Sequence, residues 1–181
     1  MKTRTITQIA LMTAVMCILG PLSVPIGPVP ISLTPLAVFL GVYVLGTKKG
    51  TLAYLVYLLI GLVGVPVLSG FTGGAAKLFG PTGGYLIGFI FMALIAGAFI
   101  SKFYSSIPIQ AIGMFAGLCV CYVFGTAWLA HQAGLSLGAA AAAGVWPFVG
   151  LDCLKIVVSI VLGRAVRTGL VKAGLLGTAA A

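Results

Sequence analysis

The chain has 181 residues, of which 61% are hydrophobic and only 6% are charged. Soluble globular domains carry roughly 25% charged residues, so this composition predicts an integral membrane protein. Asp152 is the single acidic residue against ten lysines and arginines, which gives a formal charge of +9. One carboxylate cannot form the carboxylate pair of a glycosidase or an aspartic protease, nor an acid-rich calcium or magnesium site, so these classes are excluded.

The apolar stretches predict six transmembrane helices. Each span needs about 20 predominantly apolar residues, so six spans leave no room for a second, soluble domain. We therefore expect an all-α integral membrane protein with a single membrane domain over residues 1–181. In chain order, the expected spans are about 5–20, 34–46, 51–64, 83–101, 109–131 and 145–167.

The basic residues predict the orientation of these spans, because Lys and Arg are enriched in short cytoplasmic loops. With the N-terminus inside, eight of the ten basic residues fall on the cytoplasmic side: Lys2, Arg4, Lys48, Lys49, Lys102, Arg164, Arg167 and Lys172. Both termini of this multi-pass protein of the cell membrane are therefore expected in the cytoplasm. Because the charge is scattered over four segments, it marks orientation in the lipid bilayer, and nucleic acid is not an expected partner.

Two connections between the predicted helices are unusual. Residues 21–35 contain five of the nine prolines, and residues 66–84 contain six glycines. Proline cannot continue a helix, and irregular backbone near membrane depth survives only where it is buried in protein or lines a cavity. Both segments therefore predict irregular outward-facing loops over a ligand cavity, with ordinary exposed turns as the alternative.

Asp152 and Lys155 are the most informative pair of residues. They lie three positions apart and therefore share one face of the last predicted helix. Ionisable residues inside a membrane are costly and mark functional sites, although an ion pair that only joins helices is the alternative. A carboxylate accepts N–H bonds and an ammonium donates to a carbonyl, so the pair matches a ligand group with both, such as a cyclic urea.

Two further residues are candidates for ligand contacts. Tyr85 follows the glycine-rich segment and offers a ring and a hydroxyl to a cavity, or belongs to the aromatic belt at the membrane surface. Lys77 could meet a ligand carboxylate, or is simply a solvated loop lysine.

Enzymatic alternatives lack their motifs. His131, Asp152 and a serine could form a triad on paper, but no GxSxG surrounds a serine. HExxH and GxxxxGK[ST] are also absent. We therefore expect no enzyme, no metal site and no cofactor, and any active uptake must draw energy from a partner or an ion gradient.

Small residues four positions apart suggest close helix contacts. Ala10 with Ala14, Gly84 with Gly88, and residues 113 and 117 follow this spacing. Each pair predicts either internal packing or a surface for a partner.

Four segments carry a family resemblance. VPIGPVPISLTPLAVFLGVYVLG at 24–46, GLVGVPVLSGFTGG at 61–74, FGPTGGYLIGF at 79–89 and VGLDCLK at 149–155 resemble the BioY family, the biotin-binding S components of energy-coupling factor (ECF) transporters. The resemblance implies a six-helix membrane protein that captures biotin at its outer face. It also implies partners, namely a transmembrane T component and two ATPase subunits.

The same resemblance implies roles for individual residues. Asp152 and Lys155 correspond to positions that hold the ureido ring of biotin, and Tyr85 to a tyrosine that lines the pocket. Ala10 and Ala14 match a motif that faces the T component. Three residues stay open as candidates for the biotin carboxylate: Ser69, Thr72 and Lys77.

Two other functions remain as alternatives. One is an S component of the same fold for another vitamin, and the other is a gradient-driven small-molecule transporter that acts alone. A membrane-embedded hydrolase that uses His131 is a more distant third.

Overall fold

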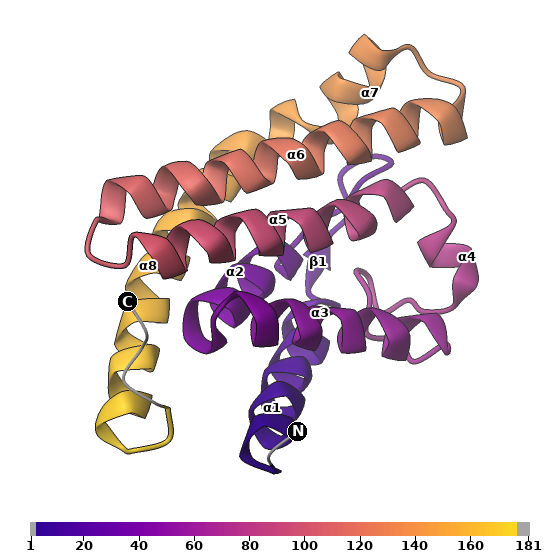
Figure 1. Cartoon of the computed structure of the whole chain (residues 1–181). Coiled ribbons are helices and arrows are strands. Elements are labelled where there is room, and N and C mark those ends of the chain that lie inside the picture. Colours follow the sequence, from indigo (N-terminus) through magenta and orange to yellow (C-terminus); the bar gives the residue numbers. More distant parts are fainter. Residues whose placement is uncertain (1–2, 177–181) are drawn as a thin grey trace.

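The structure, a computed structural model, describes residues 3–176 and is built mainly from helices (Figure 1). Six helices have between 12 and 27 residues. They are α1 (Thr3–Leu19), α2 (Thr34–Leu45), α3 (Thr47–Leu62), α5 (Gly83–Lys102), α6 (Ile107–Ala133) and α8 (Trp146–Lys172). The connections contain two short helices and two short strands, namely α4 (Ala75–Leu78), α7 (Leu137–Gly144), β1 (Ser23–Val24) and β2 (Ile31–Ser32).

Each long helix overlaps one predicted span, but the helices differ in length. Within residues 3–176, α5 and α6 are long and apolar enough to cross a membrane, and α7 with α8 forms a third candidate that is bent by 43°. α1 and α2 are apolar but shorter, with 17 and 12 residues. α2 is short because Pro35 lies in its first turn and Gly46, at φ 80°, ends it. Length and composition therefore support two or three spans, where the sequence predicts six.

α5 and α6 run side by side over most of their lengths (Figure 1). Two glycines of α5 allow this close approach. A Cβ atom on Gly88 would lie 2.9 Å from Cα of Cys121, and one on Gly84 would overlap the Trp128 side chain. Small residues let helix backbones approach in this way, so the glycine spacing on α5 serves internal packing.

The small-residue pair on α1 is arranged differently. Ala10 and Ala14 are both exposed on the helix surface. Their neighbours Leu11 and Ile18 are also exposed, at 64% and 68%. This face of α1 is therefore apolar and exposed in the described part of the chain, so burial within residues 3–176 does not account for the Ala10–Ala14 spacing.

The proline-rich and glycine-rich segments are joined to one another at one end of the helices. β1 and β2 form a short antiparallel hairpin, so the proline-rich segment is not wholly irregular and the fold is not strictly all-α. The Gly70 amide donates to the Pro21 carbonyl at 3.0 Å. The buried Tyr57 of α3 donates its hydroxyl to the Val67 carbonyl at 2.9 Å, which anchors the glycine-rich segment to the core.

Lys2, one of the basic residues that predict orientation, lies outside the described residues. Arg4 lies in the first turn of α1, Lys102 ends α5, and Arg164 and Arg167 lie in the C-terminal third of α8. The orientation across the membrane stays a prediction.

Candidate functional site

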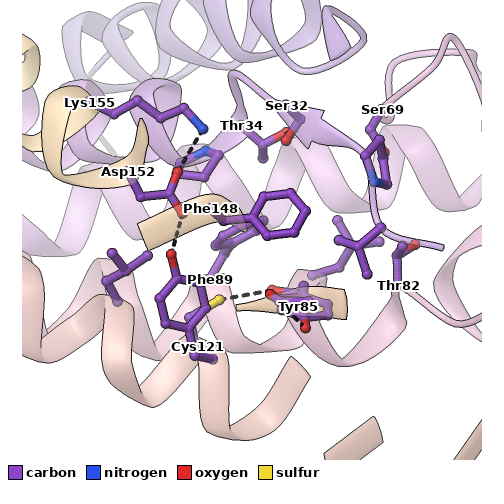
Figure 2. A pocket seen from close by; sticks show the side chains of 17 residues that line it. Ser32, Thr34, Ser69, Thr82, Tyr85, Phe89, Cys121, Phe148, Asp152 and Lys155 are labelled. Atoms are coloured by element: carbon purple, nitrogen blue, oxygen red, sulfur yellow. Dashed lines mark hydrogen bonds and ion pairs between the residues drawn. The ribbon is translucent and has the colours of Figure 1, made fainter. Parts of the chain in front are cut away.

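A cavity lies beneath the two loops, with about 550 Å³ of space between the surrounding atoms, its open mouth included. Its walls come from the β1–β2 hairpin and the start of α2, from the glycine-rich segment, and from α5, α6 and α8. Figure 2 shows the lining side chains converging on this space. The cavity therefore lies where the sequence predicts one, under the two unusual connections.

Asp152 and Lys155 lie at one end of the cavity. The Lys155 Nζ atom donates to Oδ1 of Asp152 at 2.6 Å, and the side chains of Lys155 and Asp152 are only 10% and 5% exposed. Their spacing of three residues on α8 places both on the face that points into the cavity. Removing either partner would leave the other charge buried and unpaired, which costs several kcal/mol, so each side chain depends on the other.

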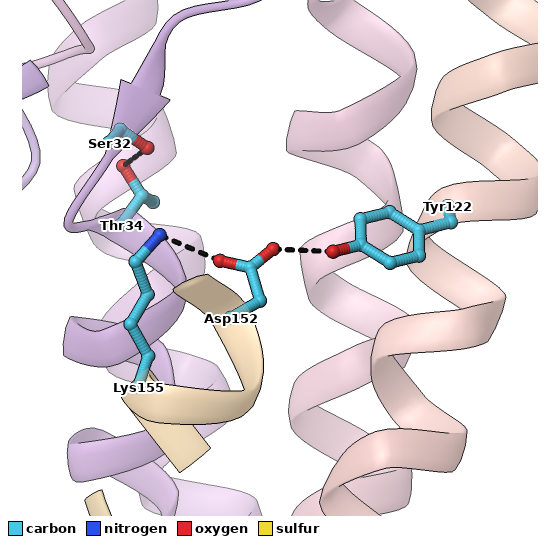
Figure 3. Close-up of polar contacts among 5 residues, drawn as sticks. All are labelled: Ser32, Thr34, Tyr122, Asp152 and Lys155. Atoms are coloured by element: carbon cyan, nitrogen blue, oxygen red, sulfur yellow. Dashed lines mark hydrogen bonds and ion pairs between the residues drawn. The ribbon is translucent and has the colours of Figure 1, made fainter. Parts of the chain in front are cut away.

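Tyr122 of α6 completes this end of the site. Its hydroxyl donates to Oδ2 of Asp152 at 2.6 Å, so α6 and α8 each engage one carboxylate oxygen (Figure 3). Sequence reasoning missed Tyr122. The available signal was that a tyrosine hydroxyl inside an apolar helix needs a hydrogen-bond partner, and the chain's single carboxylate is the strongest acceptor it could find.

The pair keeps hydrogen-bonding capacity for a ligand. An ammonium has three N–H donors, and the bond to Asp152 is the one that Lys155 makes within residues 3–176. A carboxylate offers about four lone-pair directions, of which Lys155 and Tyr122 take two. The site can therefore accept an N–H and donate to a carbonyl at the same place.

The other end of the cavity carries hydroxyl groups. Figure 2 shows Ser69 and Thr82 well away from Asp152 and Lys155, and both residues line the cavity. Phe89 and Phe148 lie between the two ends. Figure 2 also shows Ser32 and Thr34 between Lys155 and Ser69, so the middle has a wall with hydroxyl groups facing an apolar wall of Phe89 and Phe148. This arrangement suits a small elongated ligand with a different polar group at each end.

Tyr85 forms part of the cavity wall, but its hydroxyl is already used. It donates to the Gly144 carbonyl at 3.0 Å, next to the break between α7 and α8. Tyr85 therefore offers its ring to the cavity, while its hydroxyl fixes the point where the chain bends into α8.

Two predicted site residues do not line the cavity. Thr72 is exposed, and its hydroxyl donates to the Ser69 carbonyl at 2.9 Å. Lys77 lies in the short helix α4, where partial burial lowers the pKa of its ammonium. The structure thus brings Asp152, Lys155, Tyr85 and Ser69 together around one space, and places Thr72 and Lys77 outside it.

The hydrolase triad of His131, Asp152 and a serine does not assemble in the structure. His131 is exposed in the last turn of α6, whereas Asp152 is buried in the cavity wall. Among residues 3–176, no three His, Cys, Asp or Glu side chains gather as metal ligands would.

Comparisons with known proteins give a consistent result. The BioY family model matches residues 1–172. The chain is 40% identical to the biotin transporter BioY of Thermotoga maritima, covering 91% of this chain and 96% of that one. It is 39% identical to the biotin transporter BioY2 of Lactococcus lactis, covering 91% and 90%.

A solved structure is also similar. It is a 2.1 Å crystal structure described as the S-component for biotin from an ECF-type ABC transporter, and it matches with a TM-score of 0.85. The two chains are 34% identical, and the match covers 92% of each. The resemblance predicted from the four sequence segments is confirmed: the chain belongs to the BioY family.

Proposed function

We propose that this protein is the biotin-binding S component of an ECF-type transporter. It captures biotin at the outer face of the cell membrane and delivers it inward with an ATPase-driven partner module. The observation that carries the proposal is the buried Asp152–Lys155 pair at the end of a cavity beneath the two loops. Relatives named biotin transporters and the similar biotin S-component support it.

The cavity suggests how biotin is oriented. The ureido group carries both N–H groups and a carbonyl, so its N–H donates to Asp152 and its carbonyl accepts from Lys155. Tyr122 holds the carboxylate in place for this contact. The ring system and the aliphatic chain then lie against Phe89 and Phe148.

The biotin carboxylate points to the hydroxyl end of the cavity. Ser69 and Thr82 line this end and can donate to the carboxylate. Thr72 supports Ser69 through its bond to the Ser69 carbonyl, and Lys77 adds a positive charge to the same connection. Tyr85 contributes its ring to the wall.

The chain functions as one membrane domain with six spans and both termini in the cytoplasm. Six helices overlapping the six apolar segments support this topology, as does the concentration of basic residues away from the two loops. The 12-residue α2 does not need to span the hydrocarbon core alone, because the hairpin and the glycine-rich segment complete the protein at its outer end.

Energy for uptake comes from partners, which we take to be a transmembrane T component and two ATPase subunits. Ala10 and Ala14 form a small-residue surface on α1, and this surface is exposed. Small residues at such spacing allow a partner helix to approach closely in the membrane. We place the contact with the T component there. The protein itself catalyses no reaction.

Native mass spectrometry of the purified protein tests the ligand assignment directly. A bound mass equal to that of biotin is the expected result. In a competition series, unlabelled biotin should displace labelled biotin, whereas thiamine and riboflavin should not. Displacement by thiamine or riboflavin at concentrations where biotin fails would contradict the proposal and indicate an S component for another vitamin.

A second experiment tests the energy source. Vesicles that contain this protein without ATPase subunits should bind biotin but not accumulate it. Accumulation in such vesicles that collapses when an ion gradient is dissipated would indicate a solitary transporter instead.

A further inference from the structure

Two arginines on α8 form a cluster remote from the biotin cavity. Arg164 lies twelve positions after Asp152, which corresponds to about 18 Å along the helix. The guanidinium carbon atoms of Arg164 and Arg167 lie 5.4 Å and 5.0 Å from the ring centroid of Tyr104. Tyr104 belongs to the turn between α5 and α6, which Figure 1 shows beside α8.

Both guanidinium groups are held in position. The Arg167 Nη1 atom donates to the Tyr43 carbonyl at 2.9 Å, in the last turn of α2, where helix carbonyls lack partners within the helix. Arg164 Nη2 lies 3.5 Å from the Tyr104 carbonyl. Gln110 fixes the turn that carries Tyr104, because its amide donates to the carbonyls of Phe103 and Tyr104. The cluster is therefore built into the fold rather than formed by two freely moving side chains.

The two charges have no acidic side chain to pair with. Asp152 is the chain's single acid, and it is bonded to Lys155. A guanidinium has five N–H donors, and within residues 3–176 each of these two arginines uses one of them on a backbone carbonyl. Two fixed positive charges with unused donors form a site for a phosphate or a carboxylate from outside the chain.

The surface next to the cluster is apolar and exposed. Leu154, Val157 and Val161 share one face of α8 and are exposed at 59%, 58% and 62%. In a membrane protein such a stripe faces acyl chains, and it leads along α8 to the two arginines. This apolar face of α8 can contact acyl chains, and it ends at two fixed cations that can bind a phosphate. The combination fits a phospholipid better than it fits a soluble anion.

We propose that Arg164, Arg167 and Tyr104 bind the phosphate of an anionic phospholipid whose acyl chains lie along the exposed face of α8. The two arginines supply bidentate, charge-assisted hydrogen bonds, and the Tyr104 ring holds both guanidinium planes. Anionic lipids are attracted to basic clusters at the ends of membrane helices. Two guanidinium groups over one ring distinguish this cluster from Lys102, which lies alone over the Phe103 ring.

Lipid retention by the full-length protein tests this proposal. The protein is reconstituted in phosphatidylcholine vesicles with a minor fraction of phosphatidylglycerol and purified. The ratio of the two co-purified lipids is then measured by native mass spectrometry. We expect enrichment of phosphatidylglycerol on the wild type, reduced by about fivefold or more in Arg164→Gln with Arg167→Gln. No enrichment of phosphatidylglycerol on the wild type would overturn the proposal. It would favour the carboxylates of a protein partner as the ligands of Arg164 and Arg167.

A matched double variant separates the built cluster from net charge. Lys48→Gln with Lys172→Gln also removes two positive charges, from exposed positions in the first turn of α3 and the last turn of α8. This control should keep the enrichment. An equal loss of phosphatidylglycerol enrichment in both double variants would show that only the net charge matters, and would overturn the proposed lipid site. Biotin binding, whose residues are not altered, verifies that each variant is folded.

Two further arms sharpen the test. Arg164→Lys with Arg167→Lys keeps both charges but removes the planar guanidinium groups that lie over the Tyr104 ring. Phosphatidylglycerol enrichment should therefore fall by about half or more. Full retention by the lysine variant would contradict a role for stacking. Millimolar inorganic phosphate should not displace phosphatidylglycerol, and complete displacement would show a site for free anions rather than for a lipid.

Discussion

The Tyr122 hydroxyl lies 2.6 Å from Oδ2 of Asp152, while Lys155 Nζ lies 2.6 Å from Oδ1 (Figure 3). The two donors come from different helices, α6 and α8. A carboxylate held by two charge-assisted hydrogen bonds cannot rotate without breaking one of them. Asp152 therefore presents its remaining lone pairs to the cavity in a fixed direction, before any ligand arrives.

Replacing Tyr122 with Phe should weaken biotin binding. The change keeps the ring and removes one hydrogen bond to a charged group, a contact worth about 1.5–3 kcal/mol. If most of this loss appears in binding, the Kd for biotin rises about tenfold, because 1.4 kcal/mol corresponds to one factor of ten. Equilibrium binding of labelled biotin measures the change.

Tyr54→Phe is the control for this prediction. The Tyr54 hydroxyl donates to the Leu86 carbonyl at 2.8 Å in the core, and the residue is not part of the cavity wall. Tyr54→Phe should lower thermal stability and leave the biotin Kd unchanged. Wild-type affinity in Tyr122→Phe would show that Asp152 does not depend on this contact.

Removing the cation of the buried pair should affect both stability and binding. Lys155→Met leaves the Asp152 carboxylate buried without its cation, which costs about 3–5 kcal/mol of unfolding free energy. In the double variant Asp152→Asn with Lys155→Met, no charge is left buried, so stability should largely recover. Biotin binding should stay lost in both variants.

This pair of variants separates a binding site from an ion pair that only joins helices. Thermal unfolding without ligand and biotin binding are measured on the same samples. Recovery of both stability and biotin affinity in the double variant would assign the pair a purely structural role.

The wall formed by Tyr85 should be sensitive to glycine substitution on α6. A Cβ atom at position 125 would overlap the Tyr85 ring, so Gly125→Ala must displace the ring. Overpacking of this kind costs about 1–3 kcal/mol, and the displaced ring narrows the cavity proposed to hold biotin. We expect a lower unfolding temperature and a weaker biotin affinity. Gly150→Ala on α8 is the control, because its added methyl group meets no atom within 4 Å.

Gly150→Ala should keep biotin affinity and raise helix stability slightly, since alanine is favoured over glycine in helices by up to about 1 kcal/mol. Equal affinity in Gly125→Ala and wild type would show that the position of the Tyr85 ring does not matter to the ligand.

A bulky residue on the exposed face of α1 should separate binding from transport. Ala10→Trp should leave biotin binding intact, because Ala10 is exposed and lies on a helix that does not line the cavity. It should block assembly with the T component and abolish uptake. Co-purification with the partner subunits and biotin uptake by cells measure the two effects.

Val123→Trp is the control for the α1 surface. Val123 is 69% exposed on α6, so a tryptophan there also adds bulk to an apolar surface. It should assemble and transport like the wild type. Normal uptake by Ala10→Trp would place the partner contact elsewhere.

The helices and half of the site follow from local sequence signals. Prolines, glycines and basic residues delimit apolar segments, and the spacing of Asp152 and Lys155 puts both on one helix face. The contact of Tyr122 with Asp152 could not be predicted from the sequence, because the two residues are 30 positions apart and meet only through the packing of α6 against α8. That contact is tertiary, and helical spacing says nothing about it.

The choice among the hydroxyls of the glycine-rich segment also lay beyond the sequence. Ser69 and Thr72 are three positions apart, but the backbone between them turns sharply at Gly70 and Phe71, with φ values of 78° and 55°. This turn leaves Ser69 in the cavity wall and Thr72 exposed. Spacing alone could not tell which of the two hydroxyls faces inward.

The length of α2 follows from the sequence, since the predicted span 34–46 differs by one residue from the observed Thr34–Leu45, but the hairpin beside it does not. The sequence shows an apolar stretch from 34 to 46 but not how the neighbouring hairpin completes it. β1 and β2 pair over only two residues each, which is too short for a recognisable strand pattern.

Equilibrium biotin binding by Asp152→Asn tests the central claim most directly. Asparagine keeps the shape of the side chain and removes the charge that, in the proposed orientation of biotin, accepts the ureido N–H. Charge-assisted hydrogen bonds are about twice as strong as neutral ones. We predict that the wild type binds biotin in preference to thiamine and riboflavin, and that Asp152→Asn raises the biotin Kd by about tenfold or more. An Asp152→Asn protein that binds biotin as tightly as the wild type would contradict the account.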